Sequence, residues 1–194
     1  MLNDNFVYLA LLISFIGIIP YTIDTIKGKV KPNRVTWFLW SFVPFIAFIS
    51  QIKQGVGIQS LFTFMTAFTP AIVFLASFFN KKAYWKIGRL DITCGILSIL
   101  GVILWQLTSI ANLAIFFSIM ADFLAALPTV VKSWFEPETE NYIPYLTAAI
   151  SALITILTIK IWNFETGAFS IYILFMMTLI GILVKFKVGN LLKK

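Results

Sequence analysis

Seven long apolar segments, each of around 20 residues, fill most of this chain and constrain its fold more than any other feature. A helix of about 20 residues crosses the roughly 30 Å hydrocarbon core of a bilayer. The chain of 194 residues is 60% hydrophobic and 12% charged, with a mean hydropathy of +0.94. Soluble proteins carry about 25% charged residues. The sequence therefore predicts an all-α, polytopic membrane protein with no room for a soluble domain.

Proline, glycine and charged residues separate the apolar segments and set the expected helix ends. The expected helices cover residues 6–26, 35–52, 60–79, 90–107, 110–134, 142–162 and 167–186. The first segment has no basic residues before it and no small-residue cleavage site after it, so we expect a retained helix. Asp91 is expected to cap the N-terminus of the fourth helix.

Basic residues are distributed very unequally between the two sides that seven spans would define. One side has only Lys53 and Lys160. The other side has 13, namely Lys27, Lys29, Lys31, Arg34, Lys81, Lys82, Lys86, Arg89, Lys132, Lys185, Lys187, Lys193 and Lys194. Cytoplasmic loops carry the excess of Lys and Arg in membrane proteins. We therefore expect a protein of the cell (inner) membrane, with its N-terminus outside the cell membrane and its C-terminus in the cytoplasm.

The two halves of the chain carry a weak internal repeat. At an offset of 108 residues, Pro20 matches Pro128, Asn33 matches Asn141 and Trp37 matches Tyr145. Gly57 with Ser60 and Gly167 with Ser170 repeat at an offset of 110. Two three-helix units in a seven-span chain require one linker helix, which makes the units parallel. The expected division is residues 1–80, a linker at 81–108, and residues 109–194.

With this plan the sequence resembles the SWEET and PQ-loop superfamily of small membrane transporters. The shared features are the 3+1+3 helix order, the chain length and a proline near the cytoplasmic end of the first and fifth helices, here Pro20 and Pro128. The family's Pro-Gln pair is absent, because Tyr21 and Thr129 follow these prolines. The segment KPNRVTWFLW is also similar to segments of uncharacterised small bacterial membrane proteins.

Prolines within the apolar segments are candidate hinges. A proline inside a helix removes one backbone hydrogen bond and permits a bend. Pro20 and Pro128 lie at matching depths, and the resemblance implies that they act as hinges between two open states. Static kinks are the alternative, since proline is frequent in transmembrane helices.

Asp122 is the one acidic residue deep within an apolar segment. A carboxylate at that depth is costly and usually faces the interior of the helix bundle. It could bind a cation, accept a hydrogen bond from a substrate hydroxyl, or carry a proton; the alternative is a structural hydrogen bond to a neighbouring helix. Its partner in the repeat is Ser14. Asp24, nearer the basic side, is expected to pair with Lys27 or Arg34.

The resemblance also implies a substrate site between the third and seventh helices near the membrane midplane. On this chain the implied lining residues are Thr66, Thr69, Pro70, Tyr172, Met176 and Met177. Trp37 and Trp40 lie on one side of the second helix, and we expect them to anchor it at the membrane interface. Gly17 and Gly181 are expected to let helices approach closely.

Several function classes are disfavoured by residue types. The chain has no histidine and a single cysteine, Cys94, so it can form neither an internal disulfide nor a cysteine metal cluster. It also lacks paired carboxylates and a phosphate-binding loop, so we expect no enzyme, no cofactor and no metal. We attribute the net charge of +7 to contact with anionic lipid headgroups rather than nucleic acid.

Two functions remain open from the sequence. The first is a small-solute transporter, for a sugar or another small neutral metabolite, that works by alternating access and is driven by concentration alone or coupled to protons or cations. The alternative is a non-transporting receptor or scaffold of the PQ-loop type.

Overall fold

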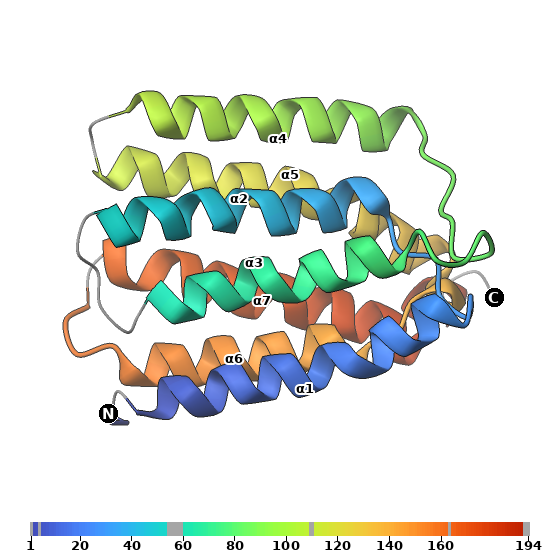
Figure 1. Ribbon diagram of the computed structural model, residues 1–194, viewed down its shortest axis with the longest axis horizontal. Coiled ribbons are helices and arrows are strands. Elements are labelled where there is room, and N and C mark those ends of the chain that lie inside the picture. Colours follow the sequence, from blue (N-terminus) through green and yellow to red (C-terminus); the bar gives the residue numbers. More distant parts are fainter. Residues whose placement is uncertain (1, 4, 54–59, 109–110, 163, 192–194) are drawn as a thin grey trace.

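The computed structural model describes residues 2–3, 5–53, 60–108, 111–162 and 164–191, and these form helices and loops without a strand. The long helices run side by side along one axis (Figure 1). Their bounds are α1 Phe6–Ile26, α2 Arg34–Lys53, α3 Ser60–Ala76, α4 Arg89–Leu107, α5 Ala111–Phe135, α6 Ile143–Thr158 and α7 Phe164–Phe186. Two short elements complete the chain, the 3-10 helix η1 Pro137–Thr139 and α8 Val188–Leu191. Gly57, from the weaker pair of repeat matches, lies outside the described residues.

The first helix shows how local chemistry ends an element. The backbone N–H of Gly28 donates to the carbonyl of Thr25 at 2.9 Å, and that of Lys29 donates to Asp24 at 2.8 Å. This pair of bonds is a Schellman motif, which needs a left-handed residue after the helix. Gly28 provides it with φ of +70°. The chain then turns back toward α2.

Two helices end earlier than the sequence predicts. α3 stops at Ala76, and the backbone N–H groups of Phe78 and Phe79 then bond to carbonyls three residues back. The Arg34 guanidinium donates to the carbonyl of Ser77 at 2.6 Å. α6 stops at Thr158, and Ile159 after it is extended with ψ of 115°. The other expected bounds agree to within three residues where the structure describes them.

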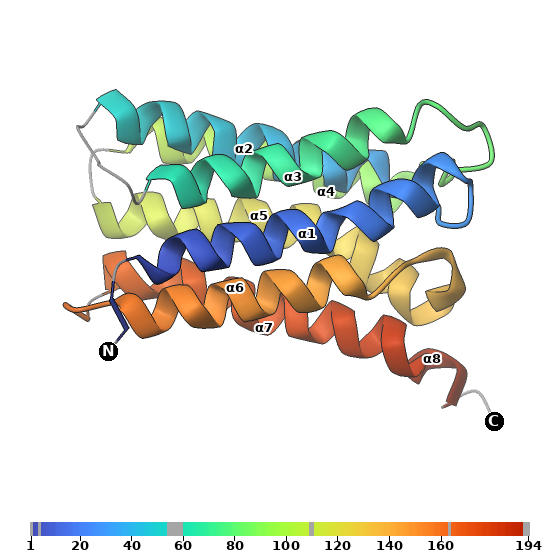
Figure 2. The ribbon, with the colours of Figure 1, turned by 60° about the horizontal axis from the view of Figure 1, so that its bottom comes forward.

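The helix contacts form two matching sets. Within the first three long helices α1 packs on α3 and α2 packs on α3; within the last three, α5 packs on α7 and α6 on α7. Between these groups α1 packs on α6, as Figures 1 and 2 both show, and α2 packs on α5. The remaining long helix, α4, lies at one side against α5 and α2.

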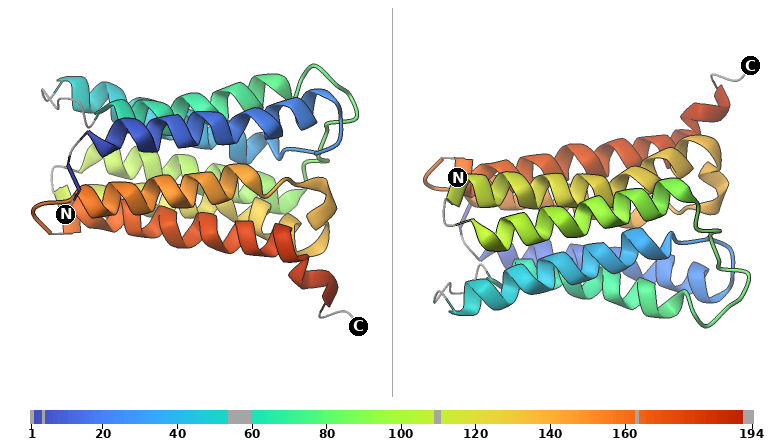
Figure 3. Two further views of the ribbon diagram at one scale, coloured as in Figure 1. Left: turned by 90° about the horizontal axis from the view of Figure 1, so that it is seen from below. Right: turned by 90° about the horizontal axis from the view of Figure 1, so that it is seen from above.

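The basic loops lie at one end of the bundle. The connections after α1, α3 and α5 are all at the right-hand end in Figure 1, together with the C-terminus, whereas the N-terminus is at the opposite end. At the right-hand end, next to the C-terminus, the short α8 turns away from the axis of α7 (Figure 3). We refer to this end as the basic end.

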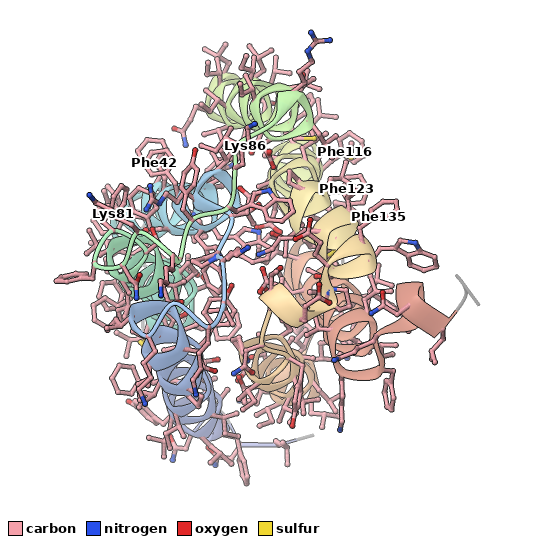
Figure 4. All side chains as sticks on the ribbon, turned by 90° about the vertical axis from the view of Figure 1, so that its right-hand side faces the viewer. Phe42, Lys81, Lys86, Phe116, Phe123 and Phe135 are labelled. Carbon is pink, nitrogen blue, oxygen red and sulfur yellow. The ribbon has the colours of Figure 1, made fainter. Side chains whose placement is uncertain are left out.

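The outer surface of the bundle is apolar. Large apolar side chains are exposed along its helices, and Figure 4 labels three of them, Phe42, Phe116 and Phe135, in a view along the bundle. Four helical segments are long and apolar enough to cross a membrane, namely Phe6–Ile26, Arg89–Leu107, Ile115–Phe135 and Gly167–Phe186. Three shorter apolar segments lie among them, namely Arg34–Ile49, Leu61–Ala76 and Ile143–Thr158. Water disfavours such a surface and lipid does not, so the protein is membrane-embedded.

Candidate functional site

Two adjoining cavities lie inside the bundle. The inner cavity has a volume of about 100 Å³ and the larger cavity about 630 Å³. Five residues line both, which are Pro44, Phe62, Thr66, Asp122 and Phe169. The larger cavity extends from the inner cavity toward the end of the bundle opposite the basic end. There the C-terminal end of α6 and the N-terminal parts of α3 and α7 surround it.

Asp122 is the one charged residue among the described residues that line the inner cavity. It projects from the middle of α5 and is only 5% exposed. The hydroxyl of Tyr172, on α7, donates a hydrogen bond of 2.7 Å to Asp122 Oδ2. The indole N–H of Trp40, on α2, lies beside the same carboxylate without forming a well-aligned hydrogen bond. Asp122 is therefore the point where three helices meet the cavity.

The α3 wall presents oxygen atoms to the same cavity. Thr66 Oγ1 donates to the carbonyl of Thr63 at 2.8 Å, and Thr69 Oγ1 donates to that of Met65 at 3.0 Å. Each hydroxyl thus uses its hydrogen within the helix and keeps lone pairs for a ligand. Pro70 has no N–H, so the carbonyl of Thr66 has no partner four residues ahead. This wall can accept hydrogen bonds from a solute.

Trp37 and Trp40 line the inner cavity rather than the membrane interface. They are only 2% and 6% exposed, so the expectation that they anchor α2 at the interface is wrong. Their spacing of three residues puts both on one helix face, and the contacts of α2 turn this face inward. Neither indole nitrogen has a hydrogen-bond partner among the described residues. Buried donors of this kind are rare in folded proteins.

Three aromatic rings form the end of the inner cavity that faces the basic loops. The ring centroids of Trp37 and Trp40 are 5.5 Å apart, and that of Tyr145 is 6.4 Å from each. Tyr21 lies behind Trp37 with a centroid distance of 4.9 Å. We call Trp37, Trp40 and Tyr145 the aromatic floor.

A buried ion pair lies behind the aromatic floor. Lys132 Nζ is 2.6 Å from Glu140 Oε1, and both side chains are fully buried. The hydroxyls of Tyr21 and Tyr145 donate to Glu140 Oε2 at 2.7 Å and 2.8 Å. Lys132 also donates to the carbonyl of Lys31. We call Tyr21, Lys132, Glu140 and Tyr145 the Glu140 cluster.

The Glu140 cluster joins elements from both ends of the sequence. Tyr21 is on α1, Lys132 on α5, Tyr145 on α6, and Glu140 follows η1. Only Tyr145 of the cluster lines a cavity. The cluster therefore separates the inner cavity from the basic end, whereas the larger cavity leads away from it.

The two repeat-related asparagines make equivalent contacts at the basic end. Asn33 Oδ1 accepts from the backbone N–H of Val35 at 3.1 Å at the start of α2. Asn141 Oδ1 accepts from that of Ile143 at 2.9 Å at the start of α6. Each amide then donates to an aspartate, Asn33 to Asp91 at 2.5 Å and Asn141 to Asp24 at 2.8 Å.

These contacts replace two pairings expected from the sequence. Asp24 binds Asn141 and lies 3.9 Å from Lys29, rather than pairing with Lys27 or Arg34. Asp91 is the third residue of α4 rather than its cap, and its Oδ2 accepts from the backbone N–H of Gly88 at 2.5 Å. Both aspartates stabilise loop geometry outside the cavities.

The candidate site residues expected from the sequence are placed as follows. Five of them line the inner cavity, which are Asp122, Thr66, Thr69, Pro70 and Met177. Tyr172 reaches this cavity through its hydrogen bond to Asp122. Met176 lies in the buried apolar core and lines neither cavity. Pro20 and Pro128 are inside α1 and α5 and also lie outside both linings.

Several apolar lining residues were not identified from the sequence. Phe62, Met65, Phe169 and Ile173 complete the apolar walls of the inner cavity. Ser14, the repeat partner of Asp122, also lines it and donates to Ser151 Oγ at 2.8 Å. The apolar residues carry no signal that separates them from lipid-facing neighbours of the same type.

Comparisons with known proteins add no information about this site. No family model, curated protein or solved structure matches the chain. Within the described residues, no three His, Cys, Asp or Glu side chains gather to form a metal site.

Proposed function

We propose that the protein is a small-solute membrane transporter that works by alternating access. Its seven long helices span the membrane as two parallel three-helix units, within residues 1–80 and 109–194, joined by a linker helix within residues 81–108. The matching contacts of α1–α3 with α5–α7, and of α1 on α6 with α2 on α5, support this arrangement.

The observation that carries the proposal is the one-sided access to Asp122. The larger cavity reaches this carboxylate from the end opposite the basic loops, while the Glu140 cluster and the aromatic floor lie between it and the basic end. A carrier that alternates its access needs a site near the middle of the bundle and a closure that can move from one side to the other. One-sided access of this kind supports the proposal, because it is what one of the two states of such a carrier would have.

The unequal distribution of basic residues supports an orientation for this state. If the protein lies in an inner membrane with its basic end toward the cytoplasm, the N-terminus and the larger cavity face the outside. Lysines of the basic end then lie close to anionic lipid headgroups. A reporter enzyme fused after Lys82 should have the activity expected in the cytoplasm, and one fused after Lys160 should have the activity expected outside. The reverse result would mean that the protein has the opposite orientation in the membrane.

Cysteine labelling tests alternating access directly. Ser118 lines the larger cavity, whereas Thr36 lies beyond the aromatic floor, where Thr129 donates to it at 3.2 Å. In a background of Cys94→Ala, Ser118→Cys should react with an impermeant maleimide added from outside. Thr36→Cys should react with reagent added from the basic side only when the carrier opens to that side. A transported solute should change both labelling rates in opposite directions.

Uptake into proteoliposomes completes the test. The full-length protein should accelerate entry of a solute that protects Ser118→Cys from labelling, and protein-free vesicles are the control. A solute that binds but is never taken up, with Thr36→Cys always unreactive, would indicate the receptor alternative instead.

A further inference from the structure

The charge of the inner cavity constrains what it can bind. Asp122 is its one ionisable side chain apart from the Tyr145 phenol, and no basic residue belongs to the described lining. The groups that face the carboxylate are the hydroxyl of Tyr172 and the indole of Trp40, both neutral donors. A buried carboxylate without a cation is strongly unfavourable at low dielectric. A bound proton or a cationic ligand relieves this cost, and only the cationic ligand does so with the carboxylate still ionised.

The aromatic floor provides a second attraction for positive charge. The faces of Trp and Tyr rings attract cations through their quadrupoles, with Trp the strongest. Trp37, Trp40 and Tyr145 are in mutual ring contact and line the same small cavity as Asp122. A carboxylate together with such rings is the chemistry that recognises an ammonium group.

The remaining polar groups favour an organic cation over a bare metal ion. Hard metal ions take six or more oxygen ligands, whereas this lining has a single carboxylate and is mostly aromatic and apolar. The indole N–H of Trp40 lies beside the Asp122 carboxylate, and that of Trp37 lies toward the Tyr21 hydroxyl behind the floor. The Thr66 and Thr69 hydroxyls keep lone pairs that can accept a hydrogen bond from an ammonium N–H or a hydroxyl of the ligand.

The cavity sizes limit the charged part of the ligand. The inner cavity, of about 100 Å³, holds roughly three waters' worth of liquid volume. The larger cavity, of about 630 Å³, has room for the rest of a small molecule. Lys160, the one basic residue in the described lining of that cavity, lies past the end of α6 rather than beside the inner cavity.

We propose that the transported solute is a small organic cation whose ammonium group binds between the Asp122 carboxylate and the aromatic floor. This inference rests on the proposed transport function and narrows it. It replaces the neutral metabolite expected from the sequence. One negative charge in the site then pairs with one positive charge on the solute.

Matched ligands test the charge requirement without any substitution. The probes are choline and its uncharged carbon isostere, in which a tert-butyl group replaces the trimethylammonium group, with tetramethylammonium and butylammonium as further cations. Binding to the purified full-length protein is followed by tryptophan fluorescence and thermal shift. Choline should bind at least about tenfold more tightly than the isostere. Equal affinity, or no binding of any of the three cations, would overturn the proposal.

A pair of aspartate variants locates the interaction. Asp122→Asn should weaken choline binding by about tenfold or more and leave binding of the isostere unchanged. Asp24→Asn is the matched control, because this carboxylate binds Asn141 outside both cavities. It should leave choline affinity unchanged. Loss of affinity in Asp24→Asn but not in Asp122→Asn would also overturn the proposal.

Uptake by proteoliposomes separates the ligand class from the transport function. Choline uptake above that of protein-free vesicles, lost in Asp122→Asn, supports both. Tight choline binding without uptake of any solute would disprove transport and leave the cation site intact. Uptake of a neutral solute that choline does not inhibit would support transport and disprove the cation site.

Discussion

At the scale of single residues, the Glu140 cluster contains a buried ion pair whose removal from water is costly. The side chains of Lys132 and Glu140 are fully buried, and their charges are offset by one another, two tyrosine hydroxyls, one carbonyl and the Trp85 ring, whose centroid is 5.0 Å from Lys132 Nζ. Buried ion pairs are favourable only when such extra hydrogen bonds are present. In the proposed transport cycle, opening of the basic end would break these bonds together.

Glu140→Gln should destabilise the protein by about 3 kcal/mol or more, because it leaves the Lys132 ammonium buried without a counter-charge. Lys132→Met combined with Glu140→Gln should recover much of this loss, since the unpaired charge is then removed. The free energy of unfolding in a detergent of constant composition measures both. Additive losses in the double variant would mean that the two side chains are not coupled.

The repeat-related asparagines allow a second residue-level prediction. Asn33→Asp and Asn141→Asp keep a capping oxygen but place a carboxylate against Asp91 or Asp24. Each should lower the melting temperature more than Asn→Ser at the same position, because like charges then meet across a hydrogen-bond distance. Asn80, an exposed-loop asparagine whose amide donates to the carbonyl of Ile26, provides the control. Equal effects of Asp and Ser would show that only the cap matters.

At the scale of helices, the apolar segments were sufficient to predict helix positions because span length and loop chemistry are local properties of the chain. Which face of each helix is buried is not a local property, because it depends on contacts with other helices. Trp37 and Trp40 were expected at the interface, and only the contacts of α2 with α3 and α5 show that they face inward. Lys132 was counted among the surface charges of the basic side. Its partner Glu140 lies across a loop, and no periodic pattern links the two.

The contact between α1 and α6 depends on the absence of a side chain at Gly17. A Cβ built there would lie 1.9 Å from Thr147 Oγ1. Gly17→Val should therefore separate the helices and cost about 1–3 kcal/mol of stability. Gly181→Ala is the control, since its Cβ would meet Tyr145 at an ordinary 3.7 Å. If Thr147→Ala restores the stability that Gly17→Val loses, the contact is confirmed. Equal stability of the two glycine variants would contradict it.

At the scale of the whole molecule, the two interior prolines at matching positions connect the fold to the proposed transport cycle. Pro20 is in α1 and Pro128 in α5, and the residues after them contact the opposite half of the chain. Tyr21 donates to Glu140, and Thr129 donates to Thr36. A bend at either proline would therefore move a contact that closes the basic end.

The last prediction concerns these two prolines together. Replacing Pro20 and Pro128 with alanine restores two backbone donors and straightens the helices, so the folded state should be at least as stable as that of the unmodified protein. Opening of the basic end should become rare: Ser118→Cys labelling persists, Thr36→Cys labelling from the basic side falls, and uptake slows by about tenfold or more. Pro137→Ala, in the short η1 element, should change none of these rates. If the double variant transports at the unmodified rate, the prolines are static kinks and the closure moves by rigid rotation of the helices.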